Sequence, residues 1–262
     1  MKVIAVVSQK GGVGKTTTAA TLAALMAADG FRVLCIDLNE QGDLTDTLAA
    51  TPGNGGTLEL LTGTDPAKLI RETNIKRVDV IAGSELLGTL ESKIQKQGTE
   101  RAMLLANALR PLRRVYRYCI LDTPGSFNTA MLNALGVADS IIIPAQADYY
   151  SLKGIGRLIN NIKFARNSIN YKLKVGGILL TRYQPRRNLS RDTVEIIKDA
   201  ENQLGTKLFD TKIRENVKTA EAPGCHKTVI EYAPTSTGAD DYRDFYKEFM
   251  NTLEGKDGKE NG

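Results

Sequence analysis

A glycine-rich segment lies near the start of the chain, between a short apolar run and a helical pattern. Residues 9–17 read QKGGVGKTT and follow the run KVIAVV at residues 2–7 after a single serine, Ser8. Glycines let a loop wrap closely around an anion with its backbone N–H groups pointing inward, and the following helix adds the positive end of its dipole. A strand, a loop of this kind and a helix form a phosphate-binding unit of α/β folds. No other feature of the sequence constrains the fold as strongly.

The rest of the chain alternates β-branched runs with helical patterns. Most of the runs are continuously apolar, which is typical of strands buried on both faces. The alternation predicts an α/β fold with a mostly parallel, twisted sheet flanked by helices. The predicted strands are Lys2–Val7, Arg32–Leu38, Val78–Ala82, Tyr118–Asp122, Ser140–Ala145, Gly176–Thr181, Lys207–Lys212 and, as a further candidate, Thr228–Glu231. The predicted helices are Lys15–Ala28, Glu100–Val115, Phe127–Leu135, Leu152–Ile169, Arg191–Leu204 and Asp240–Leu253.

The sequence shows no internal repeat and no linker that would divide it. A chain of 262 residues can bury a large core without a disulfide or a metal, so we expect residues 1–254 to form one domain. Residues 51–56 and 85–98 are expected to be irregular loops. The polar, glycine-rich residues 255–262 are expected to be a disordered tail.

Cysteine and histidine usage excludes several kinds of site. Cys35, Cys119 and Cys225 lie far apart with no CxxC pair, which argues against a disulfide framework or a zinc cluster. The single histidine, His226, excludes a multi-histidine metal site. No window approaches the ~20 apolar residues of a membrane-spanning helix, and the N-terminus lacks the features of a signal peptide. We therefore expect a cytoplasmic protein.

Positive charge is concentrated in one stretch of the chain. Residues 1–150 hold 15 basic and 15 acidic side chains, residues 151–218 hold 15 and 6, and residues 219–262 hold 5 and 9. A one-sided excess of this kind favours a polyanion partner. A solvated, lysine-rich face explains the same composition equally well.

The residue types in the glycine-rich loop indicate a site for nucleotide phosphates and magnesium. Lys15 can reach the terminal phosphates as a point charge, and Thr16 offers a hydroxyl to Mg²⁺. Asp122 ends the apolar run YCILD, and the carboxyl ends of strands line the ligand crevice of an open α/β sheet. There the carboxylate of Asp122 can hold Mg²⁺ through water.

The loop departs from the common G-x-x-x-x-G-K-[ST] form, because Gln9 takes the first glycine position and Lys10 stands at the loop's start. This KGGVGKTT form resembles the deviant Walker A motif of the ParA/MinD ATPase family, which implies a P-loop NTPase fold. In that family the extra lysine, Lys10 here, reaches across a dimer interface to the partner subunit's nucleotide.

Further segments carry the same resemblance. Residues 37–42, DLNEQG, look like the family's D-x-D-P-Q-G switch segment, and residues 118–124, YCILDTP, look like its Walker B strand. Segments between Asn133 and Gly238 are similar to those of Soj-type ParA proteins, which partition chromosomes and plasmids. The similarity covers roughly residues 1–250.

The resemblance implies ATP and Mg²⁺ as cofactors and assigns roles to individual residues. The implied catalytic residues are Lys10, Lys15, Asn39 and Asp122. The implied nucleotide contacts are Lys10, Gly11, Gly12, Val13, Gly14, Lys15, Thr16 and Thr17, with Thr181 and Asn216 near the adenine. The implied metal ligands are Thr16, Asp37 and Asp122.

Asn39 is the most important departure from the family pattern. The family has an aspartate here, which orients or activates the attacking water. Asparagine can hydrogen-bond a water but cannot accept its proton as a carboxylate does. Because phosphoryl transfer depends mainly on positioning and charge neutralisation, we expect slow hydrolysis rather than loss of binding. A natural slow hydrolase and a variant that traps the ATP state both fit. A substitute role for Glu40 is disfavoured, because alternate residues of an extended segment point opposite ways.

The function implied by the resemblance is that of a DNA-partitioning ATPase. ATP would join two subunits into a homodimer that binds DNA without sequence preference. Hydrolysis stimulated by a ParB-like partner would release the DNA, in the cytoplasm at the nucleoid. The basic stretch supplies the candidate DNA contacts, which are Arg182, Arg186, Arg187, Arg191, Lys212, Arg214 and Lys218.

Three alternatives come from other functional classes. An ATP-gated scaffold with little turnover stays open because of Asn39. A MinD-like membrane-cycling ATPase needs a basic amphipathic C-terminal helix, whereas residues 240–253 are acidic and carry an aromatic stripe that predicts packing on the core. An iron–sulfur reductase needs cysteines in loops near the nucleotide, but Cys35 and Cys119 lie in predicted strands, so we reject it.

Overall fold

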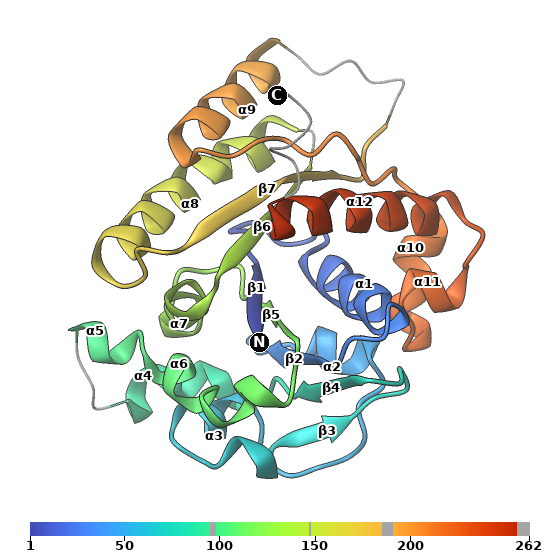
Figure 1. Ribbon diagram of the computed structural model, residues 1–262. Helices are drawn as coiled ribbons and strands as arrows, with labels where there is room; N and C mark the ends of the chain where they lie inside the picture. The colour runs from blue at the N-terminus through green and yellow to red at the C-terminus, as the bar shows by residue number, and fades with distance from the viewer. Residues whose placement is uncertain (95–97, 147, 185–190, 256–262) are drawn as a thin grey trace.

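The computed structural model describes residues 1–94, 98–146, 148–184 and 191–255, without the side chains of residues 149–153 and 191–193. Within these residues, seven strands form one sheet in the order β3-β4-β2-β5-β1-β6-β7 (Figure 1). The edge strand β3 runs antiparallel to β4, and the other neighbouring pairs are parallel. The strands are β1 (Lys2–Val6), β2 (Val33–Asp37), β3 (Ile70–Glu72), β4 (Val78–Ile81), β5 (Tyr118–Asp122), β6 (Ser140–Gln146) and β7 (Lys174–Thr181). The predicted fold class is confirmed.

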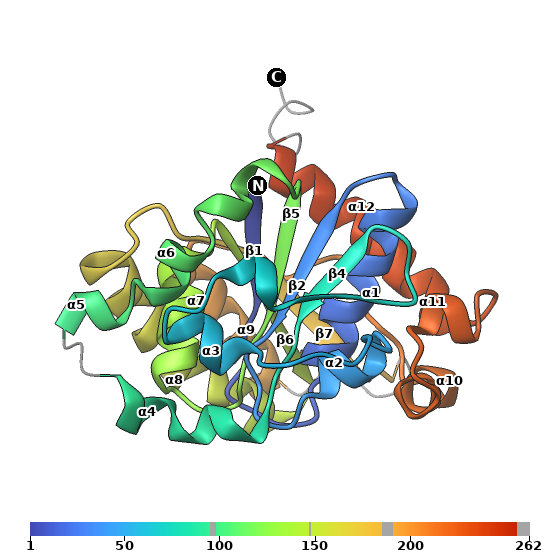
Figure 2. The same cartoon turned by 90° about the horizontal axis from the view of Figure 1, so that it is seen from below.

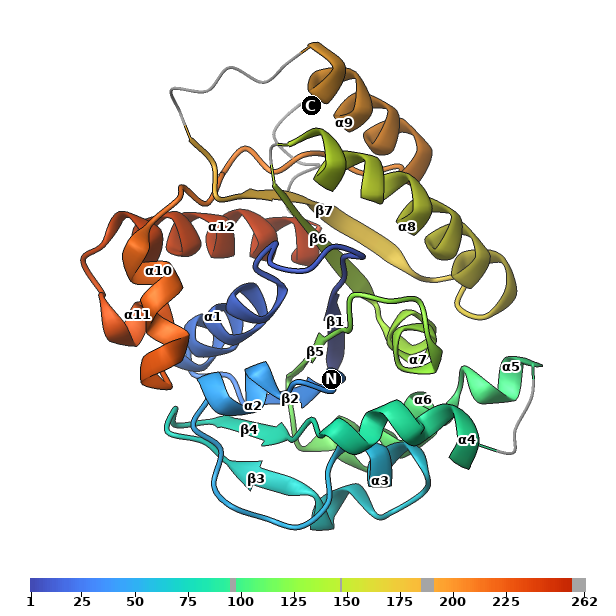
Figure 3. The same cartoon turned by 180° about the vertical axis from the view of Figure 1, so that it is seen from behind.

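Helices cover both faces of the sheet, with α1 and α12 on one side and α7 and α8 on the other (Figure 3). The α-helices are α1 (Lys15–Ala28), α2 (Asp43–Thr47), α3 (Thr57–Leu61), α4 (Leu90–Lys93), α5 (Gly98–Arg101), α6 (Leu104–Ala108), α7 (Thr129–Val137), α8 (Tyr149–Ser168), α9 (Arg191–Leu204), α10 (Val217–Glu221), α11 (Val229–Tyr232) and α12 (Thr237–Glu254). The described part of the chain also contains short 3₁₀ helices, which are η1 (Pro66–Lys68), η2 (Glu85–Thr89), η3 (Pro111–Arg114) and η4 (Ala222–Cys225).

The central strand β1 shows why its sequence is apolar throughout. Val3 and Ala5 face the core under α7 and α8, while Ile4 and Val6 face the core under α1 and α12. Successive side chains of a strand point to opposite faces, so a strand covered on both sides needs apolar residues at every position.

The aromatic stripe of α12 packs on the second of these cores. Tyr242, Phe245 and Phe249 are buried, and Leu253 is partly buried against the same cluster. The prediction of a core-packed stripe is confirmed. This packing uses the apolar face that a membrane-binding helix would need for lipid.

The predicted strand at residues 207–212 is wrong. Only an isolated bridge joins Leu208 to Ile178 of β7. The ring of Phe209 turns inward to pack against Gly177 and lies 5.0 Å from the ring of Phe245. The next two backbone N–H groups donate to the carboxylate of Glu248 at 2.8 and 3.0 Å instead of to a strand. Contacts with side chains of α12 therefore hold residues 209–211 in place of hydrogen bonds to a neighbouring strand.

The candidate strand at residues 228–231 is also wrong, because these residues enter helix α11. Its β-branched residues favour a strand locally, but Thr228 and Glu231 form a capping box. The hydroxyl of Thr228 accepts from the N–H of Glu231, and the Glu231 carboxylate accepts from the N–H of Thr228. The cap starts a helix despite the residue preferences.

The single helix predicted at residues 100–115 is broken into α5, α6 and η3. The side chain of Asn133 lies between α5 and α6, accepting from the N–H of Leu105 at 3.0 Å and donating to the carbonyl of Arg101 at 2.8 Å. It thus replaces the backbone hydrogen bond that a continuous helix would form here. Pro111 then begins the 3₁₀ turn.

Two loop predictions have different outcomes. Residues 51–56 form neither a helix nor a strand, as predicted, whereas residues 85–94, predicted to be irregular, contain η2 and α4. Gly255 ends α12 in the left-handed conformation with φ 72°, and the predicted tail at residues 256–262 lies outside the described residues.

Candidate functional site

Three neighbouring strands end at one edge of the sheet and bring the predicted site residues together. Asp37 ends β2 and Asp122 ends β5, and the two residues are partners in the strand register. Val6 of β1 pairs with Asp122 on its other side, and the glycine-rich loop follows it. A cleft of ≈ 1050 Å³ opens there, lined by the loop, by residues 39–47 and by residues 213–226.

The glycine-rich loop is shaped for an anion. Gly12 and Gly14 have φ of 72° and 83°, a region that residues with a Cβ rarely adopt. Gly14 is also the N-cap of α1 and offers no side-chain oxygen to its first N–H groups. These N–H groups and the helix dipole therefore face the cleft as an anion site.

Lys15 lies over the loop with little exposure to solvent. Its ammonium donates to the carbonyl of Lys10 at 3.1 Å. Burial lowers the pKa of Lys15, while the nearby carboxylates of Asp122 and Asp43 act in the opposite direction. The cation is thus held where phosphate charge would be stabilised.

Thr16 and Asp122, two of the three residues predicted to bind Mg²⁺, are in direct contact. The hydroxyl of Thr16 donates to Oδ2 of Asp122 at 2.6 Å. Asp122 is fully buried, and its Oδ1 receives no hydrogen bond among the described residues. Burial and the charge of Asp37 raise the pKa of Asp122 to about 7. The Thr16 hydroxyl and the buried Asp122 carboxylate oxygen are suitable ligands for Mg²⁺. The charge of the ion would offset both the burial of this carboxylate and its repulsion by Asp37.

Asp37 is the most heavily engaged of the predicted metal ligands. Oδ1 accepts from the N–H of Asn39 at 3.1 Å, and Oδ2 accepts from the N–H and the hydroxyl of Thr45 at 3.0 and 2.8 Å. Burial raises its pKa to about 6. Asp37 therefore holds the segment between β2 and α2 in place and adds negative charge beside Asp122.

Sequence reasoning missed Thr45 and Asp43. The Thr45 hydroxyl also accepts from the N–H of Gly83 at 3.0 Å, which ties the segment after β4 to α2. Asp43 begins α2, lines the cleft and lies close enough to affect Lys15 and Asp37. The helix-start signal G-D-x-T directly after the switch segment could have identified both residues.

Asn39 lies in the cleft, as expected from its position in the switch segment. Its side-chain oxygen accepts from the N–H of Gln41 at 3.4 Å. Gly83 packs directly on the backbone of Asn39, where a Cβ would contact the carbonyl oxygen. Gly83 therefore restricts the backbone of Asn39, while Asn39 itself lines the cleft.

Lys10 is held within its own chain. Its ammonium lies 2.9 Å from Oδ2 of Asp148, just beyond β6, and 3.4 Å from the side-chain oxygen of Gln146, the last residue of β6. The side chain of Gln146 in turn donates to the carbonyl of Gly12 at 3.1 Å. Lys10 thus closes a polar ring around the loop, and its role toward a second subunit stays a prediction.

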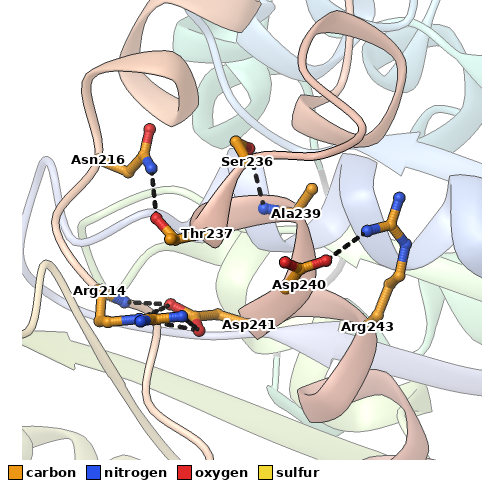
Figure 4. A network of polar contacts seen from close by, with 8 residues as sticks. All are labelled: Arg214, Asn216, Ser236, Thr237, Ala239, Asp240, Asp241 and Arg243. Carbon is orange, nitrogen blue, oxygen red and sulfur yellow. Dashed lines mark hydrogen bonds and ion pairs between the residues drawn. The ribbon is translucent and has the colours of Figure 1, made fainter.

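Thr181 and Asn216 line the far side of the cleft, but their polar groups are engaged. The hydroxyl of Thr181 donates to the carbonyl of Val13 at 2.9 Å and so supports the loop from below. Asn216 caps α10, accepting from the N–H of Lys218 and donating to Thr237 at 2.7 Å (Figure 4). Their contacts to an adenine stay predictions.

The candidate DNA contacts differ in how free their charges are. Arg214 forms a two-pronged ion pair with Asp241, with a shortest distance of 2.6 Å (Figure 4), and this carboxylate raises the pKa of Arg214. Lys218 pairs with Glu221 at 3.0 Å. Arg182 is exposed at the rim of the cleft with φ 48°. Arg186 and Arg187 lie outside the described residues, as does the side chain of Arg191. Lys212 is 5.6 Å above the ring of Tyr183.

The described residues also bear on the alternatives. Cys35 and Cys119 are buried in β2 and β5, as the rejection of an iron–sulfur reductase requires. Within the described part of the chain, no three His, Cys, Asp or Glu side chains gather as a metal cluster, and no helix is both long and apolar enough to span a membrane.

Comparison with known proteins gives a consistent picture. A family model described as an AAA domain matches residues 1–175. The chain is 35% identical to the sporulation initiation inhibitor protein Soj of Bacillus subtilis over 250 residues, which cover 94% of this chain and 97% of the relative. It is 37% identical to the chromosome-partitioning ATPase Soj of Thermus thermophilus over 247 residues, 94% of each chain. Cobyrinic acid a,c-diamide synthase from Mycobacterium smegmatis, solved with an ATP analog and magnesium, superposes with a TM-score of 0.81 at 26% identity, covering 98% of this chain and 97% of that one.

Proposed function

The chain belongs to the ParA/MinD family of P-loop ATPases, and from this premise we propose that it is a DNA-partitioning ATPase that works with ATP and Mg²⁺. The observation that carries the proposal is the contact between Thr16 and Asp122 beside Lys15, at the N-terminus of α1. A triphosphate binds where the loop N–H groups, the helix dipole and a lysine converge.

Each residue of the site has a defined task in this proposal. The loop N–H groups and Lys15 bind and orient the phosphates, while Thr16 and Asp122 hold the metal. Mg²⁺, when bound, neutralises charge on the terminal phosphates. Lys15 stabilises the negative charge that develops on the leaving oxygens. Asp37 keeps the switch segment in register with this centre through Thr45.

Asn39 sets the rate of the proposed cycle. Its amide can orient an attacking water but cannot take the water's proton, so turnover is slow. The same residue supports a second candidate function, an ATP-gated scaffold with little turnover, because its side chain lies in the cleft where an aspartate would act. The two candidates share the ATP-bound state and differ only in whether a partner accelerates its decay.

We place dimerisation and DNA binding in the ATP-bound state. Two subunits would meet at their clefts, and Lys10 would exchange Asp148 for the second subunit's phosphate. The basic excess of residues 151–218 would then be present twice on one surface, so DNA affinity rises without new contacts. A ParB-like partner would stimulate hydrolysis and release the DNA, and the protein would act in the cytoplasm at the nucleoid.

The test measures ATP turnover and binding to two unrelated duplexes, with ATP, ADP and no nucleotide, at several salt concentrations. We expect tight, sequence-independent binding only with ATP, and turnover that rises with DNA and a cognate partner. Turnover that never rises would select the scaffold. Equal DNA affinity with ATP, with ADP and without nucleotide would refute the proposal that ATP controls DNA binding.

A further inference from the structure

The single histidine of the chain joins the two walls of the cleft. Residues 39–47, which include α2, form one wall, and residues 213–226 form the other. Nδ1 of His226 lies 3.0 Å from the backbone carbonyl oxygen of Asp46. A carbonyl oxygen can only accept a hydrogen bond, so the ring carries a proton on Nδ1 and donates it. His226 thus forms a bridge from the end of η4 to α2.

The bridge reaches the last turn of α2. The carbonyl of Asp46 also accepts from the backbone N–H of Ala49 at 3.0 Å, just beyond the helix. Carbonyls in the last turn of a helix lack a partner within the helix, and a histidine can bond them. Figure 2 shows α2 beside the turn between α10 and α11, where η4 lies. His226 therefore acts as a cap that comes from a distant part of the chain.

The backbone of His226 is held on both sides. Its N–H donates to the carbonyl of Pro223 at 2.9 Å and so ends η4. Two residues later, the capping box of the buried Thr228 begins α11. The ring therefore extends from a fixed support, and its hydrogen bond fixes the end of α2 relative to the opposite wall.

The backbone conformation of His226 is one that few residues with a Cβ adopt. Its φ of 53° and ψ of 46° lie in the left-handed region. Glycine adopts this conformation without cost, and asparagine adopts it more readily than most other residues. A histidine at this position has a cost in free energy, which its hydrogen bond to α2 offsets. Strained residues of this kind cluster at functional sites.

Three contacts of different kinds hold α2 in place. Leu44 and Leu48 are buried in the core below it. Thr45 ties the start of the helix to Asp37. The bond from His226 holds its end, and no other hydrogen bond or ion pair joins the described residues of the two walls. Loss of the histidine should therefore free the end of α2 and leave its start in place beside Asp37.

We propose that His226 is a positioning residue of the nucleotide cycle, which holds the two walls together around a bound nucleotide and slows its release. This inference rests on the proposed function, because it needs a nucleotide in the cleft. A molecule between two walls leaves faster when the walls separate more often. The hydrogen bond of His226 goes to α2 and not to the phosphate loop, so the chemical step should be spared.

Two substitutions separate the hydrogen bond of His226 from its backbone conformation. His226→Asn places an amide N–H on the same atom position as Nδ1 and tolerates the left-handed conformation, so it should keep the bridge. His226→Gly removes the donor and relieves the backbone, so it should lose the bridge without strain.

The test measures the release of a fluorescent ADP analogue from the full-length chain with Mg²⁺, by stopped flow after addition of excess ADP. His226→Gly should release the analogue about three- to tenfold faster than the parent, the usual effect of one hydrogen bond, and His226→Asn should stay within about twofold of the parent. Single-turnover ATP hydrolysis should change by less than about twofold in both variants. The matched control Arg77→Gly relieves another left-handed residue, with φ 71°, at the amino end of β4 away from the cleft, and should release ADP at the parent's rate.

Two further measurements separate this role from a purely structural one. The melting temperature of His226→Gly should stay close to that of the parent, because relief of the backbone offsets the lost hydrogen bond. Amides at the end of α2 should exchange hydrogen faster in His226→Gly, even without nucleotide.

Unchanged ADP release in His226→Gly would overturn the proposal, as would release from His226→Asn as fast as from His226→Gly. A large fall in the melting temperature of His226→Gly together with faster release would assign the residue to folding and would overturn it as well. A parent chain that does not bind the ADP analogue would instead refute the proposed function, and this inference would fall with it.

Discussion

The hydroxyl of Thr16 donates a 2.6 Å hydrogen bond to one oxygen of Asp122, whose other oxygen is buried and receives none among the described residues. The two residues are far apart in the sequence and meet because β1 and β5 are neighbours in the sheet. A buried carboxylate with a free oxygen is costly unless a cation or a proton satisfies it. The site is therefore built for a cation, and in its absence it favours a proton.

Lys15→Ala should abolish binding of Mg-ATP and leave the fold intact. Lys15 supplies positive charge at the phosphate site, and its contact with the carbonyl of Lys10 is a single hydrogen bond. Titration with a fluorescent ATP analogue measures the affinity, and the far-ultraviolet circular dichroism and melting temperature report the fold. The same substitution at the exposed Lys68 serves as the control and should bind ATP normally. Unchanged affinity in Lys15→Ala would sink the assignment of the phosphate loop.

Asp122→Asn should stabilise the nucleotide-free chain at neutral and alkaline pH. The folded-state pKa of Asp122 is raised to about 7, so the stability that the protonated group contributes is present at low pH and lost as pH rises through that value. Asparagine cannot ionise and escapes this loss. Urea unfolding should show a gain of roughly 1–3 kcal/mol at about pH 8 and little difference at about pH 4.

The same variant should lose the metal-dependent gain in stability. Added Mg-ATP should stabilise the parent at neutral pH by mass action, but should stabilise Asp122→Asn far less, since a neutral amide is a poorer ligand for a hard cation. A variant that is less stable than the parent at every pH would show that the carboxylate of Asp122 is satisfied within the chain.

The sequence predicted those parts of the molecule that local chemistry specifies. The loop and the first helix followed from the pattern QKGGVGKTT, and helix α9 was predicted with its observed bounds from its periodicity. Residues whose structure depends on distant side chains were predicted wrongly. Glu248 takes the N–H groups of residues 210 and 211 out of a strand, and Asn133 divides the helix expected at residues 100–115.

The candidate site shows the same division. The positions of Lys15, Thr16 and Asp122 could be predicted because a motif fixes each one relative to a strand end. The helix-start signal marks the position of Thr45, but its contacts with Asp37 and with the N–H of Gly83 could not be predicted, because tertiary packing sets them.

Asn39→Asp should raise ATP turnover by about 10²–10⁴-fold, the usual worth of a positioned general base, and leave ATP affinity nearly unchanged. The Asn39 side chain lies in the cleft, and a carboxylate of the same size can occupy its place. Single-turnover and steady-state assays with labelled ATP measure the rate. Asn39→Ala is the control, because it removes the amide without adding a base and should not raise turnover. An unchanged rate in Asn39→Asp would show that another group activates the water.

Lys10→Ala should weaken ATP-dependent dimerisation and spare ATP binding by the monomer. Lys10 lies at the loop's start, and its ammonium pairs with Asp148 across a half-exposed ion pair at 2.9 Å. Exposed pairs contribute little to stability, so the loss of this contact should barely change the melting temperature. The contact with a second subunit's phosphate would be desolvated and therefore stronger.

Sedimentation velocity with ATP and with ADP measures dimerisation of the Lys10→Ala chain, and the nucleotide titration used for Lys15→Ala measures ATP binding by the monomer. Lys10→Arg keeps the positive charge but replaces the compact ammonium with a planar guanidinium, so this variant should dimerise more weakly than the parent but more strongly than Lys10→Ala. A Lys10→Ala chain that dimerises as strongly as the parent would confine Lys10 to its own subunit.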